Sequence, residues 1–180
     1  MANKFPKEVY EKVSTFIYEN LNTNNSIAVL LSYLNGSQLS YLALKEIKGF
    51  GKNDPYTELS VYYVNKELPI STPLCATYSI SELGFYRGAA ISTDIQTAYL
   101  AAQNPKINNI FYVYDLLQLQ GVSPEIIREI IGKGTIIIAR SKEHKKALEA
   151  GLGIKISDEV VLEINLVRFK EIIKRYFGVK

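Results

Sequence analysis

The sequence is poor in the residues that build disulfides, zinc sites and nucleophilic triads: it has one cysteine, one histidine, one methionine and no tryptophan. The single cysteine, Cys75, excludes an internal disulfide and any zinc site made of several cysteines. A chain without disulfides suits the cytosol, so we expect a cytoplasmic protein. His144 would have to serve any Ser-His-Asp or Cys-His mechanism, but it stands in the charged run SKEHKKALE, where a solvated helix position is expected.

Long apolar runs are also missing. No uninterrupted apolar run approaches the roughly 20 residues that a membrane-spanning helix needs. Charged residues from Lys4 to Glu11 interrupt the N-terminus before the apolar core of a signal peptide could form. We therefore expect a protein that is neither exported nor embedded in a membrane. Lysine, glutamate, isoleucine and tyrosine are plentiful, a composition similar to that of heat-adapted proteins.

The charge is only weakly unbalanced. The 21 basic and 18 acidic side chains give a net charge of +3 and interleave along most of the chain. Basic residues gather twice on predicted helices, with Glu143, Glu149 and Glu171 between them: Arg140, Lys142, Lys145 and Lys146, and then Arg168, Lys170, Lys174 and Arg175. Such groups usually form a solvated helix face, so a basic nucleic-acid-associated module is the third functional hypothesis.

A chain of 180 residues with 47% apolar content suffices for one core, which predicts a single domain over residues 1–180. In the first half, apolar spacing predicts an amphipathic helix over 5–21. The strands expected there are 27–34 and 57–64, with turns at 35–37 and 49–55. Residues 74–101 are harder to assign: ATYSISEL fits a strand, and STDIQTAYLAAQNP fits a helix capped by Ser92 or Thr93.

Strand-like and helix-like segments alternate in the second half. Strands are predicted at 109–117 and 135–139, and helices follow the caps Ser123 and Ser141. Residues 159–165 fit either a strand or the start of a long final helix. Four isoleucines of the second half are expected to form part of one continuous core, namely Ile126, Ile130, Ile136 and Ile138. We therefore predict an α/β domain with a mixed sheet, helices on both faces, and parallel pairing in the C-terminal half.

Residues 109–140 include VYDL followed by QLQGVSPEIIREIIGKGTIIIA. This run resembles the end of the small nucleotidyltransferase domains of antitoxin-type proteins, in which a strand ending in Val-Asp-Leu leads through a Pro-Glu-Leu-Arg-like helix to a Gly-Lys-Gly-like turn and a final apolar strand. The resemblance implies that Asp115 is the third metal-binding carboxylate.

The other parts of such a site are incomplete. Two metals need three carboxylates, two of them as Asp-x-Asp on one strand, with a Gly-Ser turn for phosphate. Gly36 and Ser37 follow a predicted strand, but Glu58-Leu59-Ser60 and Asp94-Ile95-Gln96 each lack one acid. The resemblance thus implies a degenerate scaffold that binds a ligand or regulates without catalysis. The alternative is an active nucleotidyltransferase that uses Mg²⁺ on Asp115 with Asp94 or Glu58, so whether the chain is an enzyme stays open.

Two further groups of side chains are candidate ligand contacts. The polar run of Arg87, Ser92, Thr93 and Asp94 is a candidate for a small anionic ligand, although a helix cap explains Ser92 to Asp94 equally well. Six tyrosines crowd the first half, where they either pack or present phenols to a ligand: Tyr33, Tyr41, Tyr62, Tyr63, Tyr78 and Tyr86. The sequence does not identify a partner, and a homo-oligomer stays open.

Overall fold

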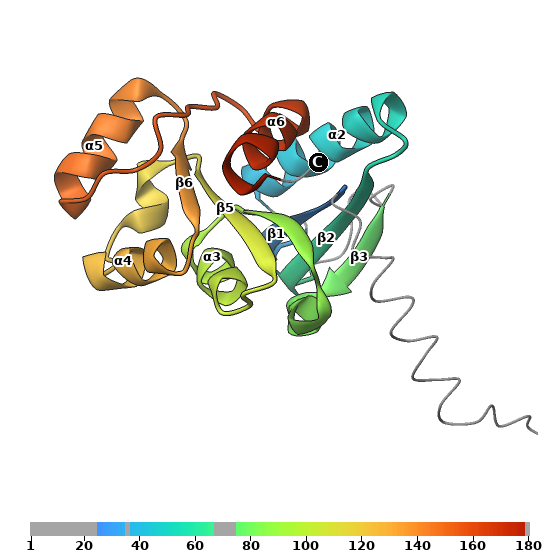
Figure 1. The fold of residues 1–180 in the computed structure, drawn as a ribbon, viewed down its shortest axis with the longest axis horizontal. Helices are drawn as coiled ribbons and strands as arrows, with labels where there is room; N and C mark the ends of the chain where they lie inside the picture. The colour runs from blue at the N-terminus through green and yellow to red at the C-terminus, as the bar shows by residue number, and fades with distance from the viewer. Residues whose placement is uncertain (1–24, 35–36, 67–74, 179–180) are drawn as a thin grey trace, which may run out of the picture.

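The computed structural model describes residues 25–34, 37–66 and 75–178. The predicted helix over 5–21 and the candidate Gly36 lie outside these ranges. Within them, helices pack on a central sheet (Figure 1). The α/β class is confirmed.

The sheet has six strands in the order β3-β2-β1-β4-β5-β6, and every pairing is parallel. The predicted mixed sheet is therefore wrong. The strands are β1 (Ser26–Tyr33), β2 (Glu58–Asn65), β3 (Ala76–Ser79), β4 (Gly88–Ser92), β5 (Ile107–Val113) and β6 (Ile136–Ala139). Parallel neighbours need long crossover connections. Three of them contain the helices α2 (Gln38–Asn53), α3 (Ile95–Ala102) and α4 (Pro124–Gly132).

Strand β4 was not predicted. Its sequence GAAIS is short and consists mostly of small residues, so it gives no strong strand pattern. It nevertheless lies between β1 and β5, and all but its first residue are buried. The strand forms because both neighbours supply hydrogen-bonding partners and helices cover both of its faces.

Helices cover both faces of the sheet, as predicted. One face packs against α2 (Gln38–Asn53) and α6 (Leu166–Phe177). The other packs against the short 3-10 helix η1 (Ile80–Phe85) and against α3 (Ile95–Ala102), α4 (Pro124–Gly132) and α5 (Lys142–Leu152). Crossovers in parallel sheets are right-handed, and the chain moves in opposite directions from β1 to β2 and from β4 to β5. The connecting helices α2 and α3 consequently lie on opposite faces.

Several predicted boundaries are confirmed and others need correction. Ser123 caps α4 and Ser141 caps α5, as the sequence predicts. The cap of α3 is Asp94, not Ser92 or Thr93. Helix α2 was missed, and most of the loop predicted at 49–55 forms its last turn.

Two later segments also differ from prediction. Strand β5 ends at Val113, and the 3-10 helix η2 (Leu116–Leu119) follows where the strand was expected to continue. Within 159–165, only Val160 makes a strand-like bridge, parallel to Ala139, and α6 starts at Leu166. The segment is therefore neither of the predicted elements.

The expected continuous isoleucine core is present only in part, because Ile130 belongs to one core cluster and Ile138 to the cluster on the other face of the sheet. Ile130 and Ile138 are fully buried, and Ile136 is partly buried against the same cluster as Ile138. The prediction is wrong for Ile126, which is 38% exposed, whereas its neighbour Ile127 is fully buried. The buried face of α4 therefore contains Ile127 and Ile130, and not Ile126 and Ile130.

Candidate ligand crevice at the carboxyl edge of the sheet

The strand order creates a position where the chain diverges. It leaves β1 toward β2 and leaves β4 toward β5, although β1 and β4 are neighbours. In open α/β sheets, ligands bind outside the carboxyl ends of the strands at such a switch point, because the loops that leave in opposite directions open a crevice. We call this position the switch crevice and define it by Tyr33, Ser37, Thr93, Asp94 and Gln118.

Thr93 directly follows β4, at the position expected for the floor of the switch crevice. Its backbone N–H and its hydroxyl both donate to the Leu30 carbonyl oxygen, at 3.2 and 2.8 Å. The Gln118 amide donates to the Thr93 carbonyl oxygen at 2.6 Å and accepts from the backbone N–H groups of Tyr114 and Asp115. These bonds fix the ends of β1, β4 and β5 relative to one another.

Three predicted site residues lie at this edge, and each of them caps a helix. Ser37 accepts from the Ser40 N–H at the start of α2. Asp94 accepts from both the N–H and the hydroxyl of Thr97, at 2.9 and 3.0 Å. Asp115 is exposed and accepts from the Leu117 N–H at 3.0 Å. Their side-chain oxygens therefore have a structural role already.

The other predicted site residues, Glu58 and Arg87, lie at the opposite end of the parallel strands, where the strands begin. Glu58 begins β2 beside Ser26, and Arg87 precedes β4. Ser92, two residues before Asp94, pairs with Leu30 on β1, four positions beyond Ser26. At about 3.3 Å per residue, this separates Glu58 from Ser92 by roughly 13 Å along the strands, so Glu58 cannot share a metal with Asp94.

The described part of the chain contains no group of three histidine, cysteine, aspartate or glutamate side chains that could hold a metal ion. The only histidine, His144, lies in the first turn of α5, where its buried Nδ1 has no hydrogen-bond partner among the described residues. A buried nitrogen without a partner is a desolvation cost, and nothing around His144 marks it as a catalytic base.

The crowded tyrosines separate into two groups. Tyr62 packs its ring 5.2 Å from that of Tyr78 and 5.5 Å from that of Tyr86. Burial raises the pKa of Tyr62 to about 12, and it raises the pKa of Tyr86 as well. Tyr62 and Tyr86 belong to the core, Tyr63 packs against the core cluster on the other face, and Tyr78 is 37% exposed. Tyr33 and Tyr41 are 43% and 66% exposed, at the end of β1 and in the first turn of α2. They are the phenols that a ligand in the switch crevice could reach.

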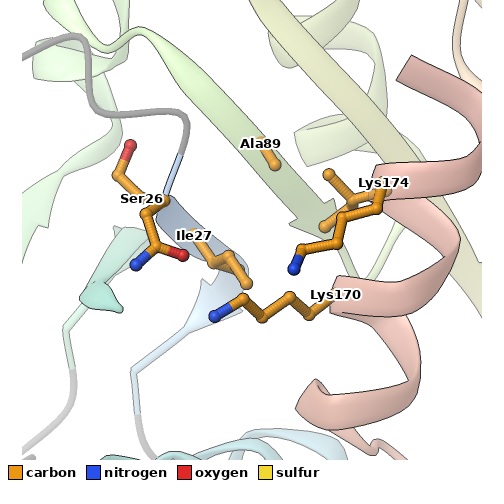
Figure 2. Close-up of a pocket in the computed structure, with 7 residues that line it drawn as sticks. Ser26, Ile27, Ala89, Lys170 and Lys174 are labelled. Carbon is orange, nitrogen blue, oxygen red and sulfur yellow. The ribbon is translucent and has the colours of Figure 1, made fainter. Parts of the chain in front are cut away.

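A small cavity lies at the other end of the sheet (Figure 2). Its walls come from β1, β4 and α6, and the ammonium groups of Lys170 and Lys174 point toward Ile27. The cavity volume is about 10 Å³, which is room for one water molecule and not for a metabolite. Lys170 is already bound to Asp54 and Thr57, each at 2.6 Å.

Several basic side chains of the C-terminal helices form ion pairs, which the sequence analysis did not predict. Lys145 pairs with Glu149 at 2.5 Å and with Asp158 at 3.4 Å. On α6, Arg168 pairs with Glu171 at 2.8 Å and with Glu159 at 2.7 Å, and Arg175 also pairs with Glu159. Acidic partners therefore compensate much of the charge that a nucleic-acid surface would need free.

One pair of residues at the carboxyl edge escaped the sequence analysis. The Arg140 guanidinium lies over the Tyr114 ring, 4.5 Å from its centroid. The available signal was position: each residue directly follows the last residue of a buried strand, β5 or β6. Arg140 was assigned instead to a solvated helix face, because it begins a run rich in lysine.

None of the helices in the described ranges combines the length and the apolar character needed to cross a bilayer.

No protein-family model matches the chain, and no solved structure gives a significant match. The chain is similar to the UPF0718 protein MJ0584 of Methanocaldococcus jannaschii, with 31% identity over 152 residues. The match covers 79% of this chain and 40% of the relative, so the chain spans less than half of the relative's length. The name of this relative states no activity, and none of the comparisons supports the resemblance to nucleotidyltransferases. This chain is therefore similar to part of a longer UPF0718 protein of Methanocaldococcus jannaschii.

Proposed function

We propose that this domain binds a small ligand in the switch crevice and does not catalyse a reaction there. The strand order carries the proposal, because it places a topological switch point between the ends of β1 and β4, where ligands bind in open parallel sheets. Two features support it. The crevice floor is held by hydrogen bonds between Thr93, Leu30 and Gln118, so the site is preformed. An exposed aromatic ring, Tyr33, stands at its rim.

The roles of the nearby acids support binding over catalysis. Asp94 uses both carboxylate oxygens to cap α3, and Asp115 caps η2. A general acid or base needs a carboxylate that can reach a substrate proton, and a two-metal site needs several carboxylates together. The proposal therefore keeps the ligand-binding or regulatory function predicted from the sequence. It rests on the parallel sheet and not on the nucleotidyltransferase resemblance, which stays a prediction.

The test is a ligand screen followed by mapping. Ligands from a panel of small anionic metabolites are selected by thermal shift, and backbone amide NMR signals are then followed during titration. We expect the signals of Tyr33, Ser37 and Thr93 to move in a saturable way, while those of Ser26 and Gly88 at the other edge stay unchanged. Saturable shifts confined to the opposite edge would contradict the proposal.

A matched pair of variants tests the role of the rim. Tyr33→Ala removes a ring that is 43% exposed at the switch crevice, and Tyr78→Ala removes one that is 37% exposed on edge strand β3. An aromatic contact contributes about 0.5–1.5 kcal/mol, so Tyr33→Ala should weaken binding by about two- to tenfold. Tyr78→Ala should leave the affinity unchanged. Equal losses in both variants would show that the ring at the crevice has no special role.

Calorimetry with Mg²⁺ separates the proposal from an active nucleotidyltransferase. We expect no saturable Mg²⁺ site at low micromolar concentration, because Glu58 lies at the other edge from Asp94 and Asp115. A tight site that Asp115→Asn abolishes would instead favour the metal-dependent enzyme.

A further inference from the structure

The ends of β5 and β6 place an arginine on an aromatic ring. Val113 pairs with Ala139, so the next residues, Tyr114 and Arg140, stand side by side at the carboxyl edge. The Arg140 guanidinium carbon lies 4.5 Å from the centre of the Tyr114 ring, and Arg140 Nε donates to the Leu162 carbonyl oxygen at 3.1 Å. Stacking and this hydrogen bond hold the guanidinium from two directions.

Both contacts leave the end of the guanidinium available. They use its flat face and Nε, and the two terminal nitrogens make no hydrogen bond or ion pair with any described residue. A guanidinium presents its donors as a rigid fork that matches the oxygens of carboxylate or phosphate. Because Arg140 is already fixed, binding an oxyanion would cost it less side-chain entropy than it would cost a free surface arginine.

Charges of both signs lie around Arg140, and one acid, Glu163, directly follows the Leu162 whose carbonyl oxygen accepts from Arg140. Helix α5 begins two residues later, with its positive dipole end at Ser141, and Lys142 is exposed in its first turn. The carboxylate of Glu143 is drawn to the Ser141 hydroxyl, which lowers the pKa of Glu143. Asp115 is the acid at the end of β5, and its carboxylate caps Leu117 without pairing with Arg140.

Hydrogen bonds connect this pair to the switch crevice. The Tyr114 N–H donates to Gln118, and the Gln118 amide donates to the Thr93 carbonyl oxygen on the crevice floor. Tyr114 is thus joined to the end of β4 through one side chain, and a ligand in the switch crevice could extend along the carboxyl ends of the strands toward Arg140.

We propose that Arg140, held by Tyr114 and Leu162, binds the oxyanion of the ligand, a phosphate or a carboxylate. This inference rests on the proposed function, because it names the charged group of the ligand that the same edge of the sheet binds. The test uses the full chain with inorganic phosphate and acetate as separate probes, which distinguishes the two oxyanions. The Arg140 Nε–H signal and the amide signals of Ser141 and Lys142 are followed by NMR during each titration.

We expect a saturable shift at these three positions with at least one probe. Arg140→Gln should weaken that binding at least tenfold, and Arg140→Lys should also weaken it, because lysine keeps the charge but lacks the fork. Tyr114→Leu keeps the arginine but removes the ring, so it should reduce the affinity by a smaller factor. The control is Arg128→Gln, which removes an exposed arginine that pairs with Glu125 on α4 and should leave binding unchanged.

The inference would be overturned if neither probe gave a saturable shift up to about 50 mM, which we take as the weakest binding of interest. It would also be overturned if Arg140→Gln and Arg128→Gln lost the same binding affinity. Arg140→Lys keeps the positive charge. A wild-type affinity in that variant would show that charge alone accounts for binding, and it would refute the proposed contact of both terminal guanidinium nitrogens with the oxyanion. The proposed function fails separately. If phosphate moves Arg140 but no metabolite moves Thr93, an oxyanion site exists without a ligand in the switch crevice.

Discussion

Helix α4 offers a direct test of how the sheet is covered, through two adjacent isoleucines. Ile127 is fully buried between α4 and the sheet, whereas Ile126 is 38% exposed. Replacing Ile127 with alanine removes three buried carbons, worth about 0.8 kcal/mol each, or about 2.4 kcal/mol in total. The cavity left behind raises the expected loss to about 3–4 kcal/mol, within the range for such substitutions.

Ile126→Ala is the matched control, because it makes the same chemical change one residue earlier on the same helix. Only part of the side chain leaves a buried position, and no closed cavity forms. The better helix propensity of alanine offsets a few tenths of a kcal/mol of this effect, so we expect the free energy of unfolding to fall by about 1 kcal/mol. The two variants should therefore differ by about 2–3 kcal/mol.

Urea unfolding followed by circular dichroism measures both values. For a slope near 2 kcal/mol per molar urea, Ile127→Ala should lower the midpoint by about 1.5–2 M and Ile126→Ala by about 0.5 M. An equal or larger loss for Ile126→Ala would refute the orientation of α4, and with it the packing of this helix against β5 and β6.

Two other predictions concern a glycine and an ion pair. Gly88→Ala should destabilise by about 1–3 kcal/mol, because Gly88 has φ 138° and an added Cβ would lie 2.4 Å from Ser26 Oγ. In Gly132→Ala of α4 the added Cβ meets nothing within 4 Å, so this variant should be more stable by about 0.4–1 kcal/mol. Thermal melts that rank the two variants the other way would contradict the backbone conformation at the start of β4. The hydrogen bond from Lys170 lowers the pKa of Asp54, so Asp54 contributes stability above its unfolded pKa of about 3.9, which is lost as the pH falls through the folded pKa. The stability gap between wild type and Lys170→Ala should be constant near neutral pH and narrow below about pH 4, and a gap that widens with acid would refute the pairing.

Local chemistry determined much of the C-terminal half. Ser123 followed by Pro124 begins a helix wherever it occurs in such a context, because the hydroxyl caps a free N–H and proline fits the first helical position. Gly153 ends α5 in the left-handed conformation at φ 65°, which glycine adopts without strain. The alternation of elements also predicted helices on both faces, and that prediction is confirmed.

The positions of the candidate site residues could not be obtained in the same way. Glu58 and Asp94 were plausible partners in sequence, but the register of the parallel strands places Glu58 where the strands begin and Asp94 where they end. Arg140 resembled one more residue of a basic helix, and only the pairing of β5 with β6 brings it onto Tyr114. Parallel neighbours are joined by long crossovers and not by a tight turn that would fix their register, so the turn residues do not reveal which positions face each other.

The sequence by itself determined the α/β class, most of the helices, and the strands with strong apolar patterns, because these depend on capping, periodicity and turn residues within a few positions. Only the tertiary structure decided that the sheet is parallel throughout, that the weak strand β4 lies beside β1, and that the topological switch point falls between these two strands. The physical reason is that GAAIS has little strand preference of its own, and it becomes a central strand through hydrogen bonds to neighbours more than 15 residues away in the chain.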